Sequence, residues 1–332
     1  MPVTLSMLDL APIAPGETAS DSFAASVALA QQAEKSGYER VWYAEHHNMP
    51  TIASSATSVL IAHVASQTST IRLGAGGIML PNHSPLVIAE QFGTLEALHP
   101  GRIDLGLGRA PGGDHSTFRA LRRDPAASDR FPQDVVELQA YLAGQSRVPG
   151  VIATPGAGSH VPLYILGSSL FGAHLAATLG LPYAFASHFA PAALHDAVAT
   201  YRREFQPSDQ LAEPYVIAGV NAIASDDHDN ALQQLTQVKR ARVQMLLRQS
   251  GQVPLDRTFT DDELDMLLDS PVGAQVASMT HYTGIGTGAE VSAYISDFAE
   301  RTSADEVIVA HSSLDVAARL RSVELLATAH HH

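Results

Sequence analysis

The sequence predicts a single-domain (β/α)8 TIM barrel, and three observations support this fold class. Short apolar runs of the kind that form buried parallel strands alternate with helical patterns along the chain. Eight such strand–helix units close a barrel, and the 332 residues leave room for one insertion beyond it. Polar or glycine-rich residues follow several of the strands, where barrels of this kind collect their reactive groups.

Eight strands are expected from runs rich in β-branched and aliphatic residues. They cover residues 3–8, 41–44, 71–74, 103–107, 163–166, 182–186, 215–224 and 306–310. Helical periodicity places helices at residues 21–36, 54–66, 85–98, 129–142, 168–179, 191–205, 226–249, 260–268 and 315–329. Gly37 and Gly180 follow two of these helices at positions where a left-handed conformation favours glycine. Residues 121–130 and 147–160 are expected to form loops.

One insertion is expected after the seventh strand, at residues 250–287. This segment is helical in part, is rich in Gly and Thr near its end, and follows a strand end where a lid covers the mouth of a barrel. Residues 1–329 are therefore expected to form one domain that includes this candidate lid. Residues 330–332 are three histidines, which look like the remnant of an expression tag.

The composition predicts a soluble, cytoplasmic protein that binds neither nucleic acid nor membranes. Hydrophobic residues make up 45% of the chain, which is enough for a sizeable core. The absence of cysteine excludes disulfides, thiolate metal sites and a cysteine nucleophile. The N-terminus lacks a signal-peptide pattern, and no stretch approaches the roughly 20 apolar residues of a membrane span. A formal charge of -14 argues against nucleic acid or an anionic membrane as a partner.

Glu45-His46-His47 directly follows the second expected strand. Neighbouring side chains alternate in direction, so one histidine faces the mouth and the other packs or hydrogen-bonds at the rim. Histidine titrates near neutral pH, which favours general acid–base or hydrogen-bonding chemistry; two purely structural histidines are the alternative. The His-x-His and His-x-x-x-His spacings of many zinc sites are absent outside the terminal histidines, so no metal site is expected.

Glycines follow the third and fourth strands. Gly76 and Gly77 permit either close approach of a flat ligand to the backbone or a tight turn without a ligand. Residues 106–112 lack the spacing of a dinucleotide fingerprint and open a loop instead of a helix. Arg109, at the end of a strand, suits a phosphate or a flavin carbonyl, or else a salt bridge at the rim.

Ser168 and Ser169 open the helix after the fifth strand. Free backbone N–H groups and the positive end of the helix dipole form an anion site at such a position, and simple N-capping is the alternative. Four arginines in a nearby loop are candidates for a counter-charge: Arg119, Arg122, Arg123 and Arg130.

Taken together, these segments resemble the bacterial-luciferase-like flavin monooxygenases, a family of (β/α)8 barrels. The likeness covers nearly the whole chain, and the combination of motifs is more specific than any one of them. The segments that carry it are A-E-H-H at 44–47, G-G-I-M-L-P-N-H at 76–83, G-R-I-D-L-G-L-G-R at 101–109 and L-G-S-S at 166–169. They are similar to the branch that includes a tailoring oxygenase of aromatic polyketide (mensacarcin) biosynthesis.

The resemblance implies roles for the residues after the second and third strands. His46 matches the catalytic histidine of the family, which assists the oxygen chemistry of the reduced flavin. Glu45 belongs to the same motif and is expected to help bind the cofactor. Gly76 and Gly77 match the place where the family has a non-proline cis peptide beneath the isoalloxazine ring.

The resemblance also implies a phosphate site. Arg109 matches a flavin-contacting arginine, and Ser168 and Ser169 match the phosphate-binding pair, with Arg130 as the expected arginine partner. Luciferase has a carboxylate at the position of Ser168 and a reactive cysteine at the position of Gly108. The serine makes phosphate binding easier to accept, whereas the missing cysteine gives no reason to expect light emission or a long-chain aldehyde substrate.

The implied function is that of a two-component monooxygenase. A separate NAD(P)H:flavin reductase supplies reduced FMN, and O2 provides one oxygen atom for hydroxylation or epoxidation of an apolar substrate, aromatic polyketides included. An apolar mouth is expected from Met7, Met79, Phe185 and Phe189, with Phe185 where luciferase has a tryptophan near the flavin. Family members are commonly dimers, so a homodimer that takes a small organic substrate is expected.

Three other functions are compatible with the same residues. An oxidoreductase of the same superfamily that uses the deazaflavin F420 passes hydride and does not activate oxygen. A flavin-binding or storage protein holds the cofactor without turnover of its own. A metal-dependent barrel hydrolase needs a bound metal ion for its activity.

Overall fold

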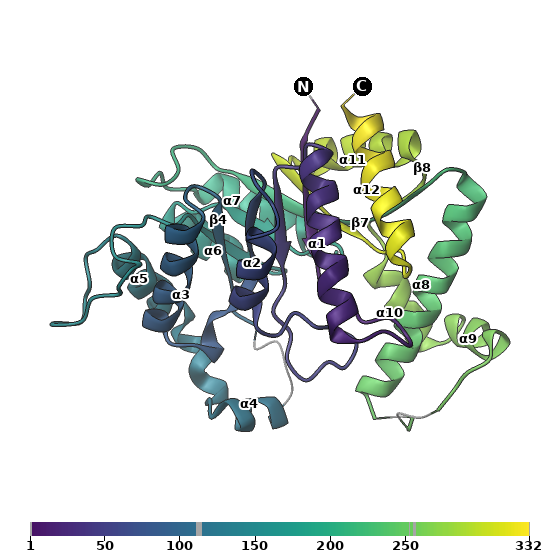
Figure 1. Cartoon of the computed structure of the whole chain (residues 1–332), viewed down its shortest axis with the longest axis horizontal. Coiled ribbons are helices and arrows are strands. Elements are labelled where there is room, and N and C mark those ends of the chain that lie inside the picture. Colours follow the sequence, from purple (N-terminus) through teal and green to yellow (C-terminus); the bar gives the residue numbers. More distant parts are fainter. Residues whose placement is uncertain (1, 111–114, 252, 255–256, 332) are drawn as a thin grey trace.

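Eight parallel strands close into a barrel with helices outside it, which confirms the predicted (β/α)8 fold (Figure 1). The computed structural model describes residues 2–110, 115–251, 253–254 and 257–331. The sheet runs in the order β6-β5-β4-β3-β2-β1-β9-β7, and the pairing of β6 with β7 closes it. The strands, with one further strand outside the barrel, are β1 (Thr4–Asp9), β2 (Arg40–Tyr43), β3 (Arg72–Met79), β4 (Ile103–Gly108), β5 (Leu163–Gly167), β6 (Tyr183–Phe185), β7 (Val216–Ser225), β8 (Thr283–Thr287) and β9 (Glu306–His311).

The additional strand, β8, is not expected from the sequence. It reads Thr-Gly-Ile-Gly-Thr, and glycine is depleted in strands. It forms because β7 continues past the barrel: residues 217–222 of β7 pair with β9, whereas residues 221–225 pair with β8. A partner strand already extended by the barrel therefore overrides the weak local preference of this segment.

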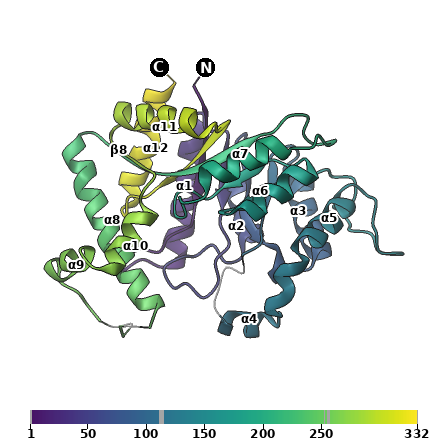
Figure 2. The same ribbon diagram turned by 180° about the vertical axis from the view of Figure 1, so that it is seen from behind.

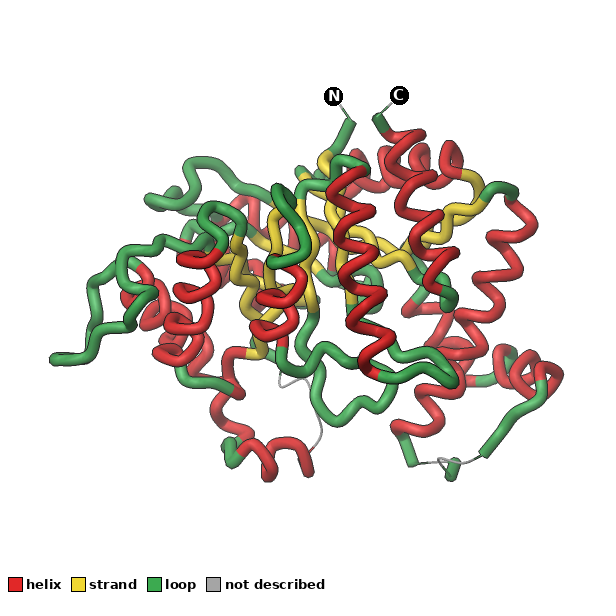
Figure 3. The backbone as a smooth tube through the Cα atoms, viewed as in Figure 1, coloured by secondary structure: helices red, strands yellow, loops and turns green. Residues whose placement is uncertain are grey.

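Helices surround the barrel, as Figure 3 shows in red around the yellow strands. They are α1 (Ala19–Lys35), α2 (Thr57–Ala65), α3 (Pro85–Leu98), α4 (His115–Leu121), α5 (Phe131–Leu142), α6 (Leu170–Leu179), α7 (Leu194–Glu204), α8 (His228–Gln249), α9 (Asp261–Leu268), α10 (Pro271–Met279), α11 (Gly288–Thr302) and α12 (Val316–His330). Two 3-10 helices, η1 (Leu80–Asn82) and η2 (Pro125–Arg130), lie after β3 and before α5. Of these elements, α4, α10, α11 and the two 3-10 helices are not expected from the sequence.

A capping signal marks the start of α11. The side chain of Thr287 accepts a hydrogen bond from the backbone of Glu290, and the Glu290 carboxylate accepts one from the backbone of Thr287. α11 packs against α7, α12, β7 and β9, so it takes the place of the seventh helix in the outer ring. α8 packs instead on β7, β8, α9 and α10, at the side of the barrel (Figures 1 and 2).

Side chains alternate in direction along each strand, so one face of the sheet points into the barrel and the other packs under the helices. One cluster consists of inward-facing apolar side chains: Leu8, Trp42, Tyr164, Ala184, Ile217 and Ile308. The opposite faces of the same strands form the larger core under the helices. Met7 and Phe185 belong to this outer core and are each 1% exposed. The prediction that they line an apolar mouth is wrong, because each lies one position out of step with the inward-facing residues.

A buried ionic network fills the amino-terminal end of the barrel. The Arg40 guanidinium donates hydrogen bonds to Asp104 at 2.7 Å, to Glu306 at 2.9 Å and to the Tyr164 hydroxyl at 2.8 Å. Arg72 also donates to Asp104, at 3.1 Å from its Nε. Because these side chains occupy that end of the barrel axis, a ligand has to enter from the carboxyl ends of the strands.

The carboxyl ends of the strands lie at the end of the molecule away from the chain termini, which sit side by side (Figures 1 and 2). α4, α9 and the last turns of α8 lie at this end. At the opposite end, His330 is buried in α12 and donates to the Val3 carbonyl at 2.8 Å. Within the described part of the chain, no helix has both the length and the hydropathy needed to cross a membrane.

Candidate active site at the carboxyl ends of the strands

Glu45 joins the loop after β2 to the loop after β3. Its Oε1 accepts hydrogen bonds from Nε2 of His47 at 2.9 Å and from Nε2 of His83 at 2.8 Å. Its Oε2 accepts the backbone N–H of Met79 at 3.3 Å, and the residue is 1% exposed. Burial acts to raise the pKa of Glu45, but the hydrogen bonds from the two imidazoles bring it below its ordinary value. The buried carboxylate is therefore ionised at neutral pH.

The Glu45–His47 pair predicts a pH-dependent stability. The hydrogen bond to Glu45 raises the pKa of His47, although burial acts against it. Such a contribution is complete below the ordinary histidine pKa of 6.5 and is lost as pH rises through the higher folded value. We expect the loss of unfolding free energy in Glu45→Gln to shrink between about pH 6 and about pH 8. Urea unfolding of both proteins across this range measures it; a constant difference would contradict a charged His47.

Glu45, His47 and His83 also make a metal-compatible group. One ligand atom from each lies within 4.8 Å of the other two. Two histidines and a glutamate are a set that zinc uses, and here the same atoms are already hydrogen-bonded to one another. Histidine spacing in the sequence does not reveal this group, because His83 joins it from a different loop.

His46 has surroundings unlike those of the histidine beside it. Its backbone N–H donates to the Ser54 carbonyl at 3.1 Å, and its Nδ1 is buried without a partner among the described residues. Burial lowers the pKa of His46, with the attraction of Glu45 opposing it in part. At pH 7 the imidazole is therefore neutral, and it has a ring nitrogen free to accept a proton or a hydrogen bond.

The peptide bond between Gly76 and Gly77 is cis, as the resemblance implies. Neighbouring strands press close to both residues. A Cβ at Gly76 would lie 2.9 Å from Cβ of Trp42, and one at Gly77 would lie 2.8 Å from the carbonyl oxygen of Gly106. Glycine is therefore favoured at both positions, and bare backbone faces the barrel axis here.

Arg109 and the start of α6 come together because β4 and β5 are neighbours in the sheet. The guanidinium carbon of Arg109 lies 4.1 Å from the centre of the Phe171 ring in the first turn of α6. Ser168 and Ser169 precede this turn and are exposed. Ser169 is the N-cap residue, yet its side chain makes no capping hydrogen bond. Simple N-capping therefore does not occupy this hydroxyl.

Among the described residues, Arg130 does not contact Arg109, Ser168 or Ser169. Its side chain is 74% exposed and lies 3.7 Å from the Asp134 carboxylate. The η2 segment that carries it approaches the loop after β4, since Ser128 Oγ donates to the Arg109 carbonyl at 3.5 Å. Another arginine of the region, Arg123, donates to the Asn82 carbonyl at 3.1 Å and so ties this loop to the one after β3.

Comparison with known proteins agrees with this fold. The family model described as luciferase-like monooxygenase matches residues 3–306. The chain belongs to the luciferase-like monooxygenase family. It is therefore an oxidoreductase by family.

Individual members of the family show how extensive the similarity is. A luciferase-like monooxygenase of Escherichia coli (strain K12) is 47% identical over 329 residues, which cover 97% of this chain and 96% of the relative. The crystal structure of apo-MsnO8 is 35% identical with a TM-score of 0.87, covering 99% of this chain and 98% of that one. The N-acetyl-S-alkylcysteine monooxygenase of Bacillus subtilis (strain 168) is 41% identical over 189 residues, 55% of this chain and 57% of the relative.

Three polar residues near the mouth of this luciferase-like monooxygenase are not found by sequence reasoning. They are His188, Asn221 and Arg242. His188 has a visible signal, because it continues the inward alternation that begins at Ala184. Arg242 has none, since one arginine among several on a long amphipathic helix reads as solvated surface.

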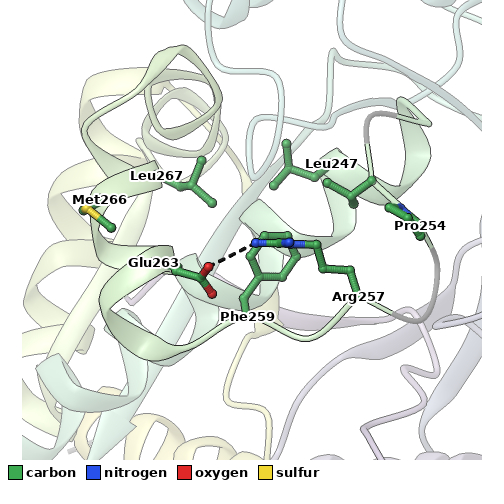
Figure 4. Close-up of a pocket in the computed structure, with 8 residues that line it drawn as sticks. Leu247, Pro254, Arg257, Phe259, Glu263, Met266 and Leu267 are labelled. Atoms are coloured by element: carbon green, nitrogen blue, oxygen red, sulfur yellow. Dashed lines mark hydrogen bonds and ion pairs between the residues drawn. The ribbon is translucent and has the colours of Figure 1, made fainter.

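A surface pocket of the luciferase-like monooxygenase lies in the segment expected to be a lid. It has a volume of about 530 Å³ and is lined by residues from the end of α8, the following loop and α9. Figure 4 shows Arg257 and Glu263 joined across it by a hydrogen bond of 3.0 Å. The Arg257 guanidinium also lies 4.9 Å from the centre of the Phe259 ring. None of the strand-end residues lines this pocket.

Proposed function

We propose that the chain is a flavin-dependent monooxygenase that uses reduced FMN and O2 to insert one oxygen atom into an apolar organic substrate. The insertion is a hydroxylation or an epoxidation, and a separate NAD(P)H:flavin reductase supplies the reduced FMN. Family membership supports an oxygen-transferring oxidoreductase. The observation that carries the proposal is the buried Nδ1 of His46, which has no partner among the described residues, at the same strand ends as the side-chain-free backbone of Gly76 and Gly77.

The described residues fit a flavin on three counts. Gly76 and Gly77 present backbone without side chains to a flat ring system. Arg109 offers a cation to a ring carbonyl or a phosphate. The start of α6 offers free N–H groups, together with the exposed hydroxyls of Ser168 and Ser169, to the phosphate.

In this proposal the residues around the flavin bind it and move a proton. The bound reduced FMN supplies the electrons that activate O2 for oxygen transfer. His46, neutral at pH 7, accepts and returns a proton at Nδ1. Glu45 holds the loops after β2 and β3 in place through its three hydrogen bonds. Arg130 adds a second positive charge to the phosphate site by giving up its long contact with Asp134.

In the same proposal, residues 250–287 act as a lid within one barrel domain formed by residues 1–329; residues 252, 255 and 256 of this segment lie outside the described residues. α9 and α10 pack on α8, and α9 lies at the strand-carboxyl end of the molecule. Closure over the mouth excludes water from the reacting flavin, which an oxygenase requires.

Of the four residues expected to form an apolar mouth, Met79 and Phe189 remain candidates. Phe189 is 47% exposed and lies beside His188.

Stopped-flow mixing with oxygen tests the function. The protein is loaded with reduced FMN under anaerobic conditions and then mixed with aerated buffer. We expect a transient flavin species whose spectrum differs from those of reduced and oxidised FMN and which outlives any formed by free FMN. The physical reason is exclusion of water from the strand ends.

The opposite result separates the alternatives. Oxidation of bound FMN as fast as that of free FMN would contradict a monooxygenase. Tight binding of reduced F420 without oxygen consumption would then indicate a hydride-transferring member of the superfamily. Activity that disappears with a chelator and returns with zinc would indicate a metal-dependent hydrolase centred on Glu45, His47 and His83.

A further inference from the structure

Arg242 on α8 carries a positive charge that no carboxylate of the described residues neutralises. Its Nη2 donates to Oδ1 of Asn221 at 3.0 Å, and its Nη1 donates to the Met279 carbonyl at 3.1 Å. Both acceptors are uncharged. Burial lowers the pKa of Arg242, in contrast to Arg40, which Glu306 and other partners hold in its charged form. Partial burial of a cation without a counter-ion costs free energy unless a bound anion neutralises the charge.

A hydrogen bond to Asn221 connects Arg242 to the barrel mouth. This asparagine is 1% exposed on β7, four residues beyond the inward-facing Ile217 and in step with it. Its Nδ2 donates to the His188 carbonyl at 2.6 Å, and its Oδ1 also accepts from Ser312 Oγ at 3.1 Å. The loops after β6 and β9 therefore meet α8 at this amide.

His188 connects this cation to the candidate catalytic histidine. Its ring lies over Gly219, where a Cβ would come 2.5 Å from its Nδ1, so it occupies space on the barrel axis. Its Nδ1 is buried and has no partner among the described residues. Burial, with the nearby Arg242 and His46, lowers the pKa of His188 to about 3. His188 therefore stays neutral and adds no second positive charge beside Arg242.

We propose that Arg242 binds a carboxylate on the organic substrate, which is therefore an amphipathic acid with an apolar reacting part. The inference rests on the proposed monooxygenase function and names the substrate class of that site. A guanidinium has five N–H donors, so donors remain for a two-point contact with a carboxylate. His188 lies near both Arg242 and His46, and the Phe189 ring packs against it with the ring centres 5.0 Å apart.

Calorimetric titration with a matched pair of probes tests the proposal. The protein, with and without oxidised FMN, is titrated with (benzylthio)acetate and with its methyl ester, which differ at the recognised end by one negative charge and one methyl group. We expect the wild type to bind the acid about tenfold or more tightly than the ester, as charged hydrogen bonds allow. Arg242→Gln should remove this preference and leave the affinity for the ester within about twofold.

A matched variant controls for the change of charge. Lys239→Gln removes one positive charge from the same helix and should preserve the preference for the acid. FMN affinity, measured separately by fluorescence titration, should be equal in the wild type and Arg242→Gln. A fall in FMN affinity in Arg242→Gln would overturn the proposal, because the guanidinium would then serve the flavin.

Two further outcomes also decide the question. Equal binding of acid and ester by the wild type would overturn the proposal, as would an equal loss of acid binding in Lys239→Gln. Where Arg242→Gln does not fold, Arg242→Lys, which keeps the charge, should retain part of the preference for the acid. Binding without FMN isolates this test from the flavin, so failure of the monooxygenase proposal leaves the outcome for Arg242 readable.

Discussion

Replacing His46 with alanine is expected to lower the yield of oxygen transfer by about 100-fold or more while FMN binding is kept. The expectation follows from the buried Nδ1, which has no partner in the described part of the chain, and from the lowered pKa, which together make His46 a proton acceptor at neutral pH. A single-turnover reaction with reduced FMN, O2 and a panel of aromatic and alkene-containing compounds, with and without a carboxylate, measures the yield by mass spectrometry. Flavin fluorescence titration measures the binding.

Two further variants sharpen the result for His46. His46→Asn keeps a hydrogen-bonding side chain but does not transfer a proton, so its yield should be nearly as low as that of His46→Ala. His63→Ala removes an exposed histidine from α2 and should leave the yield unchanged. Full yield in His46→Asn would contradict a proton-transfer role, and loss of FMN in His46→Ala would make His46 a binding residue instead.

Replacing Arg40 with alanine is expected to lower the free energy of unfolding by about 3–5 kcal/mol. The substitution leaves Asp104 and Glu306 as buried carboxylates without their shared guanidinium. Urea unfolding of the wild type and the variant measures the loss. The deficit should narrow as pH falls toward about 5, because burial already raises the pKa of Glu306 and protonation then removes the unpaired charge.

An exposed ion pair provides the matched control for Arg40. Arg203 pairs with Glu204 at 2.7 Å on the surface of α7, where its side chain is 63% exposed. Arg203→Ala should cost about 0–1 kcal/mol, as surface pairs do. Similar losses of unfolding free energy in Arg40→Ala and Arg203→Ala would show that the buried network around Arg40 adds no more stability than an exposed ion pair.

Much of the candidate site follows from strand ends that are visible in the sequence. Glu45, His46, Gly76, Gly77 and Arg109 all lie at or just past predicted strands, and the structure brings these strands together as neighbours. Local pattern was sufficient here because parallel strands of a closed barrel present their carboxyl ends at one face. The pattern failed for Met7 and Phe185, since apolar character alone does not tell the inward face of a strand from the outward one.

Contacts between segments far apart in the sequence could not be predicted from local pattern. His83 joins Glu45 across 38 residues, and Arg242 meets Asn221 from a helix that leaves the barrel at its side. Which residues become partners depends on the path of the connecting segments through space. The hydrophobic periodicity of the sequence does not determine that path. The same holds for β8, whose glycine-containing sequence pairs only because β7 runs on past β9.

The sequence by itself determined the barrel, the order of its strands and the face at which polar residues gather, because apolar periodicity dictates which surfaces must be buried. The tertiary structure decided which side chains share that face as partners. It placed α11 in the outer ring instead of α8, tied two histidines to one buried carboxylate and left Arg242 without a counter-ion among the residues that the structure describes. The reason is that the pairing of charges depends on distances between segments far apart in the chain, and folding alone sets those distances.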